Sequence, residues 1–323
     1  MRSYNHRASI GAFDMQPTPQ RFIALAALLC ACGGESAADP FEPVDGVPEV
    51  AQLSAVWAFG PADVWVAADA GQMLHYDGTD WTTTQLSESV AMLDIWAASP
   101  NDIWAAGDNT VAHYDGSEWA LTDLSLIDFD IQGITTIHGF SGTDIWIAGS
   151  QSTTAHFDGT TWTRYPAGSS ENVALWGWGS DDLYTGGVFE AAHWDGTAWS
   201  PVENLEHGVT AAYGASPDDY WVADGERLSH WNGTFWETES LGELGGIKSM
   251  WGTAADDIWG VGEFATVYHY DGTAWDLQQS QTMGSPYLQE FVDLHGTADD
   301  DIWAVSMRYG DDGTTPEVYR HGG

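Results

Sequence analysis

Short runs of alternating apolar and polar residues recur along most of this chain, and turn-forming residues separate them. The stretch 92–106 is typical: Met-Leu-Asp-Ile-Trp is followed by Ala-Ala-Ser-Pro-Asn and then by Asp-Ile-Trp-Ala-Ala. An alternation with a period of two is typical of β-strands, whereas the period of an α-helix is absent from these runs. The pattern predicts an all-β protein built from many short strands.

The runs belong to a sequence repeat that occurs seven times, at spacings of 37–44 residues. Each repeat has an anchor residue, an aspartate six residues later and an aromatic residue two positions after that. The anchors are Trp57, Trp96, His138, Trp176, Tyr213, Trp251 and His295. The aspartates are Asp63, Asp102, Asp144, Asp182, Asp219, Asp257 and Asp301, and the aromatic residues are Trp65, Trp104, Trp146, Tyr184, Trp221, Trp259 and Trp303.

A third motif completes the first six repeats, and it reads HYDGTDW in the first of them. Its histidines are His75, His113, His156, His193, His230 and His269. The Asp-Gly or Asn-Gly pair inside the motif predicts a tight hairpin, because both residues tolerate positive φ. Each repeat then contains four strands, which is the signature of a propeller blade. We therefore predict a seven-bladed β-propeller of four-stranded antiparallel blades.

The seventh repeat ends before its fourth strand, and an unpaired strand at the seam of a ring would be prone to aggregation. The missing strand is predicted at the other end of the chain. Phe41 precedes the first anchor by 16 residues, much as Trp81 precedes the second anchor by 15. We expect residues 41–46 to complete blade seven and close the ring.

Charge narrows the choice of partners. The chain has 8 Lys and Arg against 48 Asp and Glu, and after residue 31 the numbers are 5 and 47. So negative a field repels phosphates and anionic lipids, and it attracts cations and basic proteins. We expect no nucleic-acid partner, membrane contact through a lipid anchor only, and a monomer.

The N-terminal residues predict export. An apolar run over residues 22–32 follows Arg21, too short for a membrane-spanning helix and typical of a secretory signal. Its end resembles the bacterial lipobox, which implies that Cys32 carries the lipid and that the protein is an outer-membrane lipoprotein, periplasmic or surface-exposed. The predicted organisation is a signal peptide over 1–31, a lipidated tether over 32–40 and the propeller over 41–323. The sequence leaves open whether the protein starts at Met1 or at Met15.

The repeat pattern DIWAxG…HYDGTxW resembles the tryptophan-rich propeller repeats of predicted myxobacterial lipoproteins, and it is similar to tectonin-type repeats. The resemblance covers about residues 50–323. Tectonin-like propellers include lectins, so it implies carbohydrate binding as one function.

Most residues that could take part in catalysis or metal binding occupy positions of the repeat. We expect each repeated histidine to bond the aspartate of its own blade, which resembles the Asp–His network of WD-type propellers. No nucleophile motif, phosphate loop or zinc pattern is present, so we expect no enzymatic activity and no required cofactor. Calcium at acidic loops stays an open alternative.

Departures from the repeat concentrate on one face of the predicted disc, where the second-to-third turns and the connections between blades lie. Two insertions there flank blade seven, and loops on a rigid scaffold often carry binding groups. The candidate ligand-binding residues are Tyr287, Phe291, Arg308, Tyr309, Asp311 and Asp312.

The favoured function is a binding or adhesion module for a glycan or a protein. The alternatives are an assembly lipoprotein that docks a protein partner and a calcium-dependent propeller. A lectin should show a shallow aromatic pocket repeated around the ring or built at blade seven, and an enzyme a deep pocket with convergent polar groups.

Overall fold

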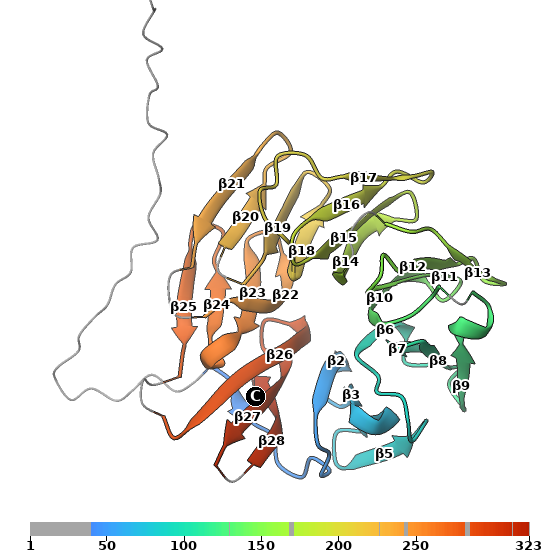
Figure 1. Ribbon diagram of the computed structural model, residues 1–323. Coiled ribbons are helices and arrows are strands. Elements are labelled where there is room, and N and C mark those ends of the chain that lie inside the picture. Colours follow the sequence, from blue (N-terminus) through green and yellow to red (C-terminus); the bar gives the residue numbers. More distant parts are fainter. Residues whose placement is uncertain are drawn as a thin grey trace, which may run out of the picture.

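The computed structural model describes residues 40–128, 130–167, 171–225, 227–241, 245–281, 285–311 and 313–322. These residues form seven four-stranded antiparallel sheets, which stand around a common centre like the blades of a propeller (Figure 1). In each blade the first strand is innermost, and the first strands of successive blades contact one another. The predicted all-β, seven-bladed β-propeller is confirmed.

The strands of blades one to three are β2 (Leu53–Gly60), β3 (Asp63–Ala68), β4 (Gln72–Tyr76), β5 (Trp81–Gln85), β6 (Asp94–Ser99), β7 (Asp102–Gly107), β8 (Thr110–Tyr114), β9 (Trp119–Asp123), β10 (Ile134–Ser141), β11 (Asp144–Gly149), β12 (Thr154–Phe157) and β13 (Trp162–Arg164). Those of blades four to six are β14 (Asn172–Gly179), β15 (Asp182–Gly187), β16 (Ala191–Trp194), β17 (Trp199–Pro201), β18 (Ala211–Ser216), β19 (Asp219–Ala223), β20 (Arg227–Trp231), β21 (Trp236–Ser240), β22 (Ile247–Ala254), β23 (Asp257–Gly262), β24 (Val267–Tyr270) and β25 (Trp275–Gln279). Blade seven consists of β26 (Tyr287–Ala298), β27 (Asp301–Gly310), β28 (Gly313–His321) and β1 (Glu42–Pro43).

Within the described ranges, three single-turn 3₁₀ helices lie between strands: η1 (Asp69–Gly71), η2 (Leu124–Leu126) and η3 (Glu263–Ala265). They lie in second-to-third turns or between blades. Among the described residues, no helix has the length and apolar character needed to cross a membrane.

The Asp-Gly turns have a common construction, and the turn after β8 illustrates it. The Asp115 carboxylate accepts the backbone N–H groups of Ser117 and Glu118 at 2.8 and 2.9 Å. These bonds, together with one from the Ser117 hydroxyl, lower the pKa of Asp115 to about 2. Gly116 has φ +91°, which residues with a side chain rarely adopt. The turns therefore make one face of the disc nearly constant, and we call the opposite face the variable face.

The N-terminal strand closes the ring. β1 pairs with β28 in antiparallel register, and the N–H of Val44 continues the pairing to the carbonyl of Val318 at 2.8 Å. The Phe41 side chain is buried, and its ring lies 6.1 Å from that of Trp259, edge to face. The fourth-strand Trp119 has the same edge-to-face contact with Trp65 at 5.8 Å. The prediction that the N-terminus supplies the missing strand is confirmed.

At several boundaries an anchor side chain packs against the next blade at the centre of the ring. A Cβ atom on Gly139 would lie 2.8 Å from the ring of Trp96, the anchor of the preceding blade. Gly252 and Gly296 have the same relation to the anchors Tyr213 and Trp251. Because these glycines have no side chain, the anchor ring of the preceding blade can lie close to their backbone. This packing contributes apolar contacts between the innermost strands of neighbouring blades.

Candidate ligand-binding site

The repeated histidines take part in a network inside each blade. In blades one to six the histidine Nε2 lies 2.6–2.8 Å from an aspartate Oδ1 of the same blade. Each imidazole also lies on the second-strand aromatic ring, with centroids 4.0–4.5 Å apart. In blade seven Arg320 replaces the histidine: its Nη2 lies 3.1 Å from Asp301, and its guanidinium lies over Trp303. The expected hydrogen bonds are present, and they join the strands of one blade.

These groups are not arranged to share a metal ion. Each pair belongs to a different blade, so the six pairs are distributed around the ring. Among the residues that the structure describes, no group of three or more His, Cys, Asp or Glu side chains could hold a metal ion.

A groove of about 470 Å³ opens on the rim between blades one and two. Its inner wall is aromatic, with Trp65 stacked on His75 and, from the next blade, Tyr114 and Trp119 at 5.4 and 5.8 Å from Trp65. Polar side chains line its edges: Thr82, Thr84, Gln85, Ser117 and Glu118. The groove therefore offers ring faces beside hydroxyl, amide and carboxylate groups.

A second groove, of about 260 Å³, lies between blades four and five at the equivalent place in the repeat. Tyr184, His193, Trp231 and Trp236 correspond there to the four aromatic residues of the first groove, and Ser200, Glu203 and Asn204 supply polar groups. The fourth-strand tryptophan is buried at two other boundaries, Trp162 between blades two and three and Trp275 between blades five and six. In both grooves this tryptophan, Trp119 or Trp236, keeps part of its surface exposed. We call them the rim grooves.

Blade seven does not gather the residues predicted there. Phe291 is fully buried and packs against Phe41 and Tyr319, so its prediction as a ligand contact is wrong. It lies in a strand rather than a loop, because the insertion lengthens β26 to 12 residues. Asp311 is exposed in the turn that follows β27, and Asp312 lies outside the described residues.

The other three candidates lie on two faces of the blade-seven sheet. Arg308 lies 5.1 Å from the ring of Tyr287, and its Nε is 3.5 Å from the Glu317 carboxylate. Tyr309 follows Arg308 in the strand and therefore points to the opposite face, where it pairs with Leu288. The arginine is already engaged within the blade. These residues thus form no single pocket.

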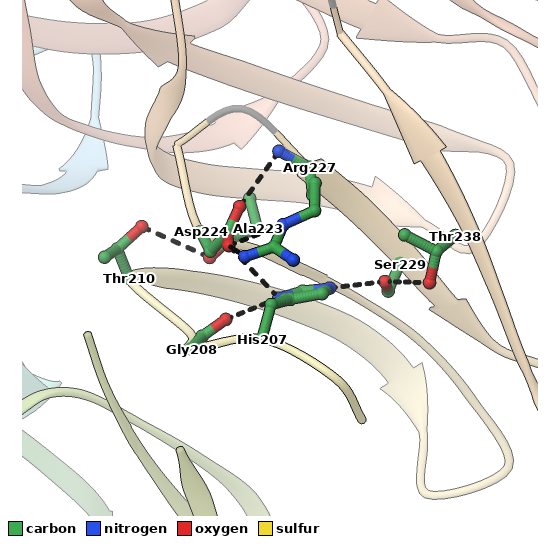
Figure 2. Close-up of polar contacts among 8 residues, drawn as sticks. All are labelled: His207, Gly208, Thr210, Ala223, Asp224, Arg227, Ser229 and Thr238. Carbon is green, nitrogen blue, oxygen red and sulfur yellow. Dashed lines mark hydrogen bonds and ion pairs between the residues drawn. The ribbon is translucent and has the colours of Figure 1, made fainter. Parts of the chain in front are cut away.

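Sequence reasoning missed a polar cluster in blade five, which Figure 2 shows. His207 lies outside the repeat register, in the connection before β18, and its side chain is buried. Its Nδ1 donates to the carbonyl of Gly208 at 2.6 Å, and its Nε2 accepts the Ser229 hydroxyl at 2.6 Å. The Ser229 hydroxyl in turn accepts the hydroxyl of Thr238 at 2.7 Å. A histidine that breaks the repeat was the signal in the sequence.

The succession Ser229–His207–Asp224 is similar in residue types to a nucleophilic triad, but its geometry differs. The Asp224 carboxylate lies 3.7 Å from His207 Nδ1 and is held instead by the backbone and side chain of Arg227. Ser229 has no exposed surface, so a substrate carbonyl has no access to its hydroxyl. The cluster fastens the connection from blade four to the strands of blade five (Figure 2).

Two carboxyl groups lie at the centre of the ring, each bonded to the next blade. Asp94 Oδ2 accepts the N–H of Ile137 at 2.8 Å, and Asp293 Oδ2 accepts the N–H of Val56 at 2.9 Å. Burial, with the charge of Asp293, raises the pKa of Asp94 to about 7. Burial raises the pKa of Asp293 to about 6. These groups therefore make folding depend on pH.

Solved structures with the same architecture include several propellers. The chain is similar to YCF48 bound to a D1 peptide, at 16% identity and a TM-score of 0.66 over 89% of this chain and 98% of that one. It is similar to the WD40 propeller domain of Doa1, at 10% identity and a TM-score of 0.66 over 86% and 96%. The extracellular domain of a proposed one component system from B. thetaiotaomicron matches at 13% identity and a TM-score of 0.62, over 87% of this chain and 40% of that one.

No protein-family model and no curated protein matches the chain. At identities of 10–16%, the structural likenesses bear on the fold alone. The chain is a seven-bladed β-propeller, with WD40 propellers among its structural neighbours.

Proposed function

We propose that this chain is an exported, non-enzymatic binding module that recognises a glycan in the rim grooves. The observation that carries the proposal is the recurrence of one shallow aromatic groove at two equivalent blade boundaries. The flat C–H face of a sugar ring packs on an aromatic ring, and its hydroxyl groups bond to polar side chains such as Thr84 and Glu118. A shallow aromatic pocket repeated around the ring is the feature expected of a lectin.

The absence of catalysis is part of this proposal. Each groove has one carboxylic side chain in its lining, Glu118 in the first and Glu203 in the second, so neither lining offers a pair of acids for glycoside hydrolysis. The buried position of Ser229 supports the same conclusion.

Anchoring at the cell envelope is proposed from the sequence. The apolar run and the lipobox-like residues before Cys32 support it, although they lie outside the described residues. The extracellular domain from B. thetaiotaomicron, which is similar in fold, is an example of such an architecture outside the cell in another protein. Incorporation of labelled palmitate that is lost in Cys32→Ala is the expected result; labelling that persists in the variant would contradict the assignment.

The glycan proposal is tested by an array screen of the full-length chain, with calcium and with chelator, followed by calorimetric titration of the best glycan. We expect saturable binding with two sites. Thr84→Trp should fill the first groove with a side chain from an exposed strand position and reduce the stoichiometry from two to one. Thr83→Trp is the matched control, because Thr83 points to the other face of the same strand.

Two outcomes would count against the grooves. An array without binding under every condition would remove the glycan function, and equal loss in both variants would place the site elsewhere. A protein partner is the second candidate, because YCF48 has been solved with a bound peptide and because apolar side chains are exposed on the variable face.

A further inference from the structure

Exposed apolar side chains gather on the variable face where blade six meets blade seven. Phe264 lies in the turn between β23 and β24 and is 45% exposed. Tyr287 and Leu288 begin β26, and Tyr309 ends its partner strand; all three are more than one-third exposed. Gln281 joins the two blades here, since its N–H donates to the Phe264 carbonyl and its Nε2 to the Tyr287 carbonyl, both at 2.6 Å. We call Phe264, Tyr287, Leu288 and Tyr309 the ridge.

The ridge exists because blade seven is longer than its neighbours. β27 has ten residues, whereas the equivalent β11 has six. The additional pairing carries β26 and β27 beyond the level at which other blades turn, and it ends where Tyr287 pairs with Gly310 (Figure 1). Cross-strand pairing of Leu288 with Tyr309 places two apolar side chains together on one face of the extension, and Tyr287 lies on its other face beside Arg308. The apolar surface is thus carried on a regular, hydrogen-bonded scaffold.

The backbone conformation of Phe264 is unfavourable for its side chain. Phe264 has φ +54°, in the left-handed region, which is an outlier for a bulky residue. Blade one makes the same turn with Ala70 at φ +51°, and blade two places Asp108 at φ +55° there. The turn therefore forms equally with a small or a polar residue at this position. One edge of the phenyl ring lies close to Gly245 and 45% of the residue stays exposed, and strain of this kind gathers at functional positions.

Charge identifies the complementary partner. Each of the five Lys and Arg residues after residue 39 forms an ion pair within the chain: Arg164 with Asp130, Arg227 with Asp224, Lys248 with Glu290, Arg308 with Glu317 and Arg320 with Asp301. The carboxylates far outnumber these bases, and Glu263 and Asp311 are exposed beside the ridge. A surface of apolar groups flanked by carboxylates complements a ligand with apolar and basic groups.

We propose that the ridge docks a cationic amphipathic segment of a protein partner. Apolar side chains of the segment pack on Phe264, Leu288 and Tyr309, and its basic side chains lie beside Glu263 and Asp311. The site lies on the variable face, apart from the rim grooves. Its test is therefore independent of the test for glycan binding.

The test is fluorescence anisotropy of the full-length chain with three synthetic 12-residue peptides. One alternates arginine with phenylalanine, the second has serine in place of phenylalanine, and the third has glutamate in place of arginine. We expect saturable binding of the first peptide, at least tenfold weaker binding of the second, no binding of the third, and affinity that falls with added salt.

Phe264→Gly separates docking from folding. Glycine adopts the left-handed conformation without strain, so the variant should unfold at the same temperature as the wild type or higher. We expect its affinity for the arginine–phenylalanine peptide to fall at least tenfold. Phe235→Ser is the matched control, because Phe235 is a comparably exposed phenylalanine in the turn between β20 and β21 on the constant face.

Three results would overturn the proposal. The first is wild-type affinity in Phe264→Gly, and the second is an equal loss in Phe235→Ser. The third is a dimer in sedimentation that Phe264→Gly dissociates, since the ridge would then be an interface between copies of this chain.

Discussion

Replacing Phe41 by alanine is expected to lower the free energy of unfolding by about 3–5 kcal/mol, as for other buried phenylalanines. The Phe41 side chain is buried at the seam of the ring, and its ring lies within about 6 Å of those of Trp259, Phe291 and His321. Its loss leaves a cavity between blades six and seven and weakens the docking of β1. Urea denaturation followed by tryptophan fluorescence measures the effect as a shift in midpoint.

Glu42→Ala is the control for this change. Glu42 lies next to Phe41 in the same strand but is exposed, so its replacement should move the midpoint little. Deleting residues 40–47 should destabilise more than Phe41→Ala, because it also removes the backbone pairing with β28. An unchanged midpoint in the deletion would show that the ring is stable without its N-terminal strand.

Stability is expected to fall as pH rises from about 4 to about 7, because Asp94 and Asp293 bind protons more tightly in the folded state. The pKa values of about 7 and about 6 lie above the value of 3.8 for an unperturbed aspartate. The two groups therefore favour the folded state most below pH 4, and this contribution is lost as each group ionises in the folded protein. We expect the combined loss to be about 1–3 kcal/mol, since both side chains keep some contact with solvent.

Denaturation of the wild type and of Asp94→Asn at pH 5, 6, 7 and 8 tests this expectation. Asparagine keeps an oxygen acceptor for the Ile137 N–H but carries no charge. The variant should be more stable than the wild type by a margin that grows from pH 5 to about pH 7 and then levels off. Comparing the two profiles cancels the general repulsion among the other carboxylates. Parallel profiles would show that Asp94 does not titrate in this range.

The sequence alone was sufficient for the blades, their number and the closing strand. A repeat of this length imposes the same four strands on each unit. The fixed spacing of anchor, aspartate and aromatic residue allows one pairing register for the first two strands. The equivalence of Phe41 and Trp81 was visible for the same reason. The hydrogen bonds between His and Asp were also foreseeable, since their partners recur at constant spacing within one blade.

Only the tertiary structure decided where the grooves open. Trp119 and Trp162 occupy the same place in the repeat, yet the first lines a groove and the second is buried. The exposure of either ring depends on which side chains of the neighbouring blade cover it. That cover comes from another repeat, so the position of the tryptophan within its own repeat does not predict it.

The arrangement of blade seven and of the centre of the ring could not be predicted from the sequence either. An insertion in the sequence was consistent with loops, but the chain extended two strands instead. Tyr287 and Phe291 lie on the same face of β26, yet Phe291 packs into the core with Phe41 and Trp259, whereas Tyr287 lies at the exposed end of the strand. Asp94 and Asp293 lie about 200 residues apart, and closure of the ring brings them close enough for the charge of one to raise the pKa of the other. The sequence by itself determined the repeated unit, because the repeat is local. The tertiary structure decided burial, the grooves and the coupled charges, because these depend on contacts between blades.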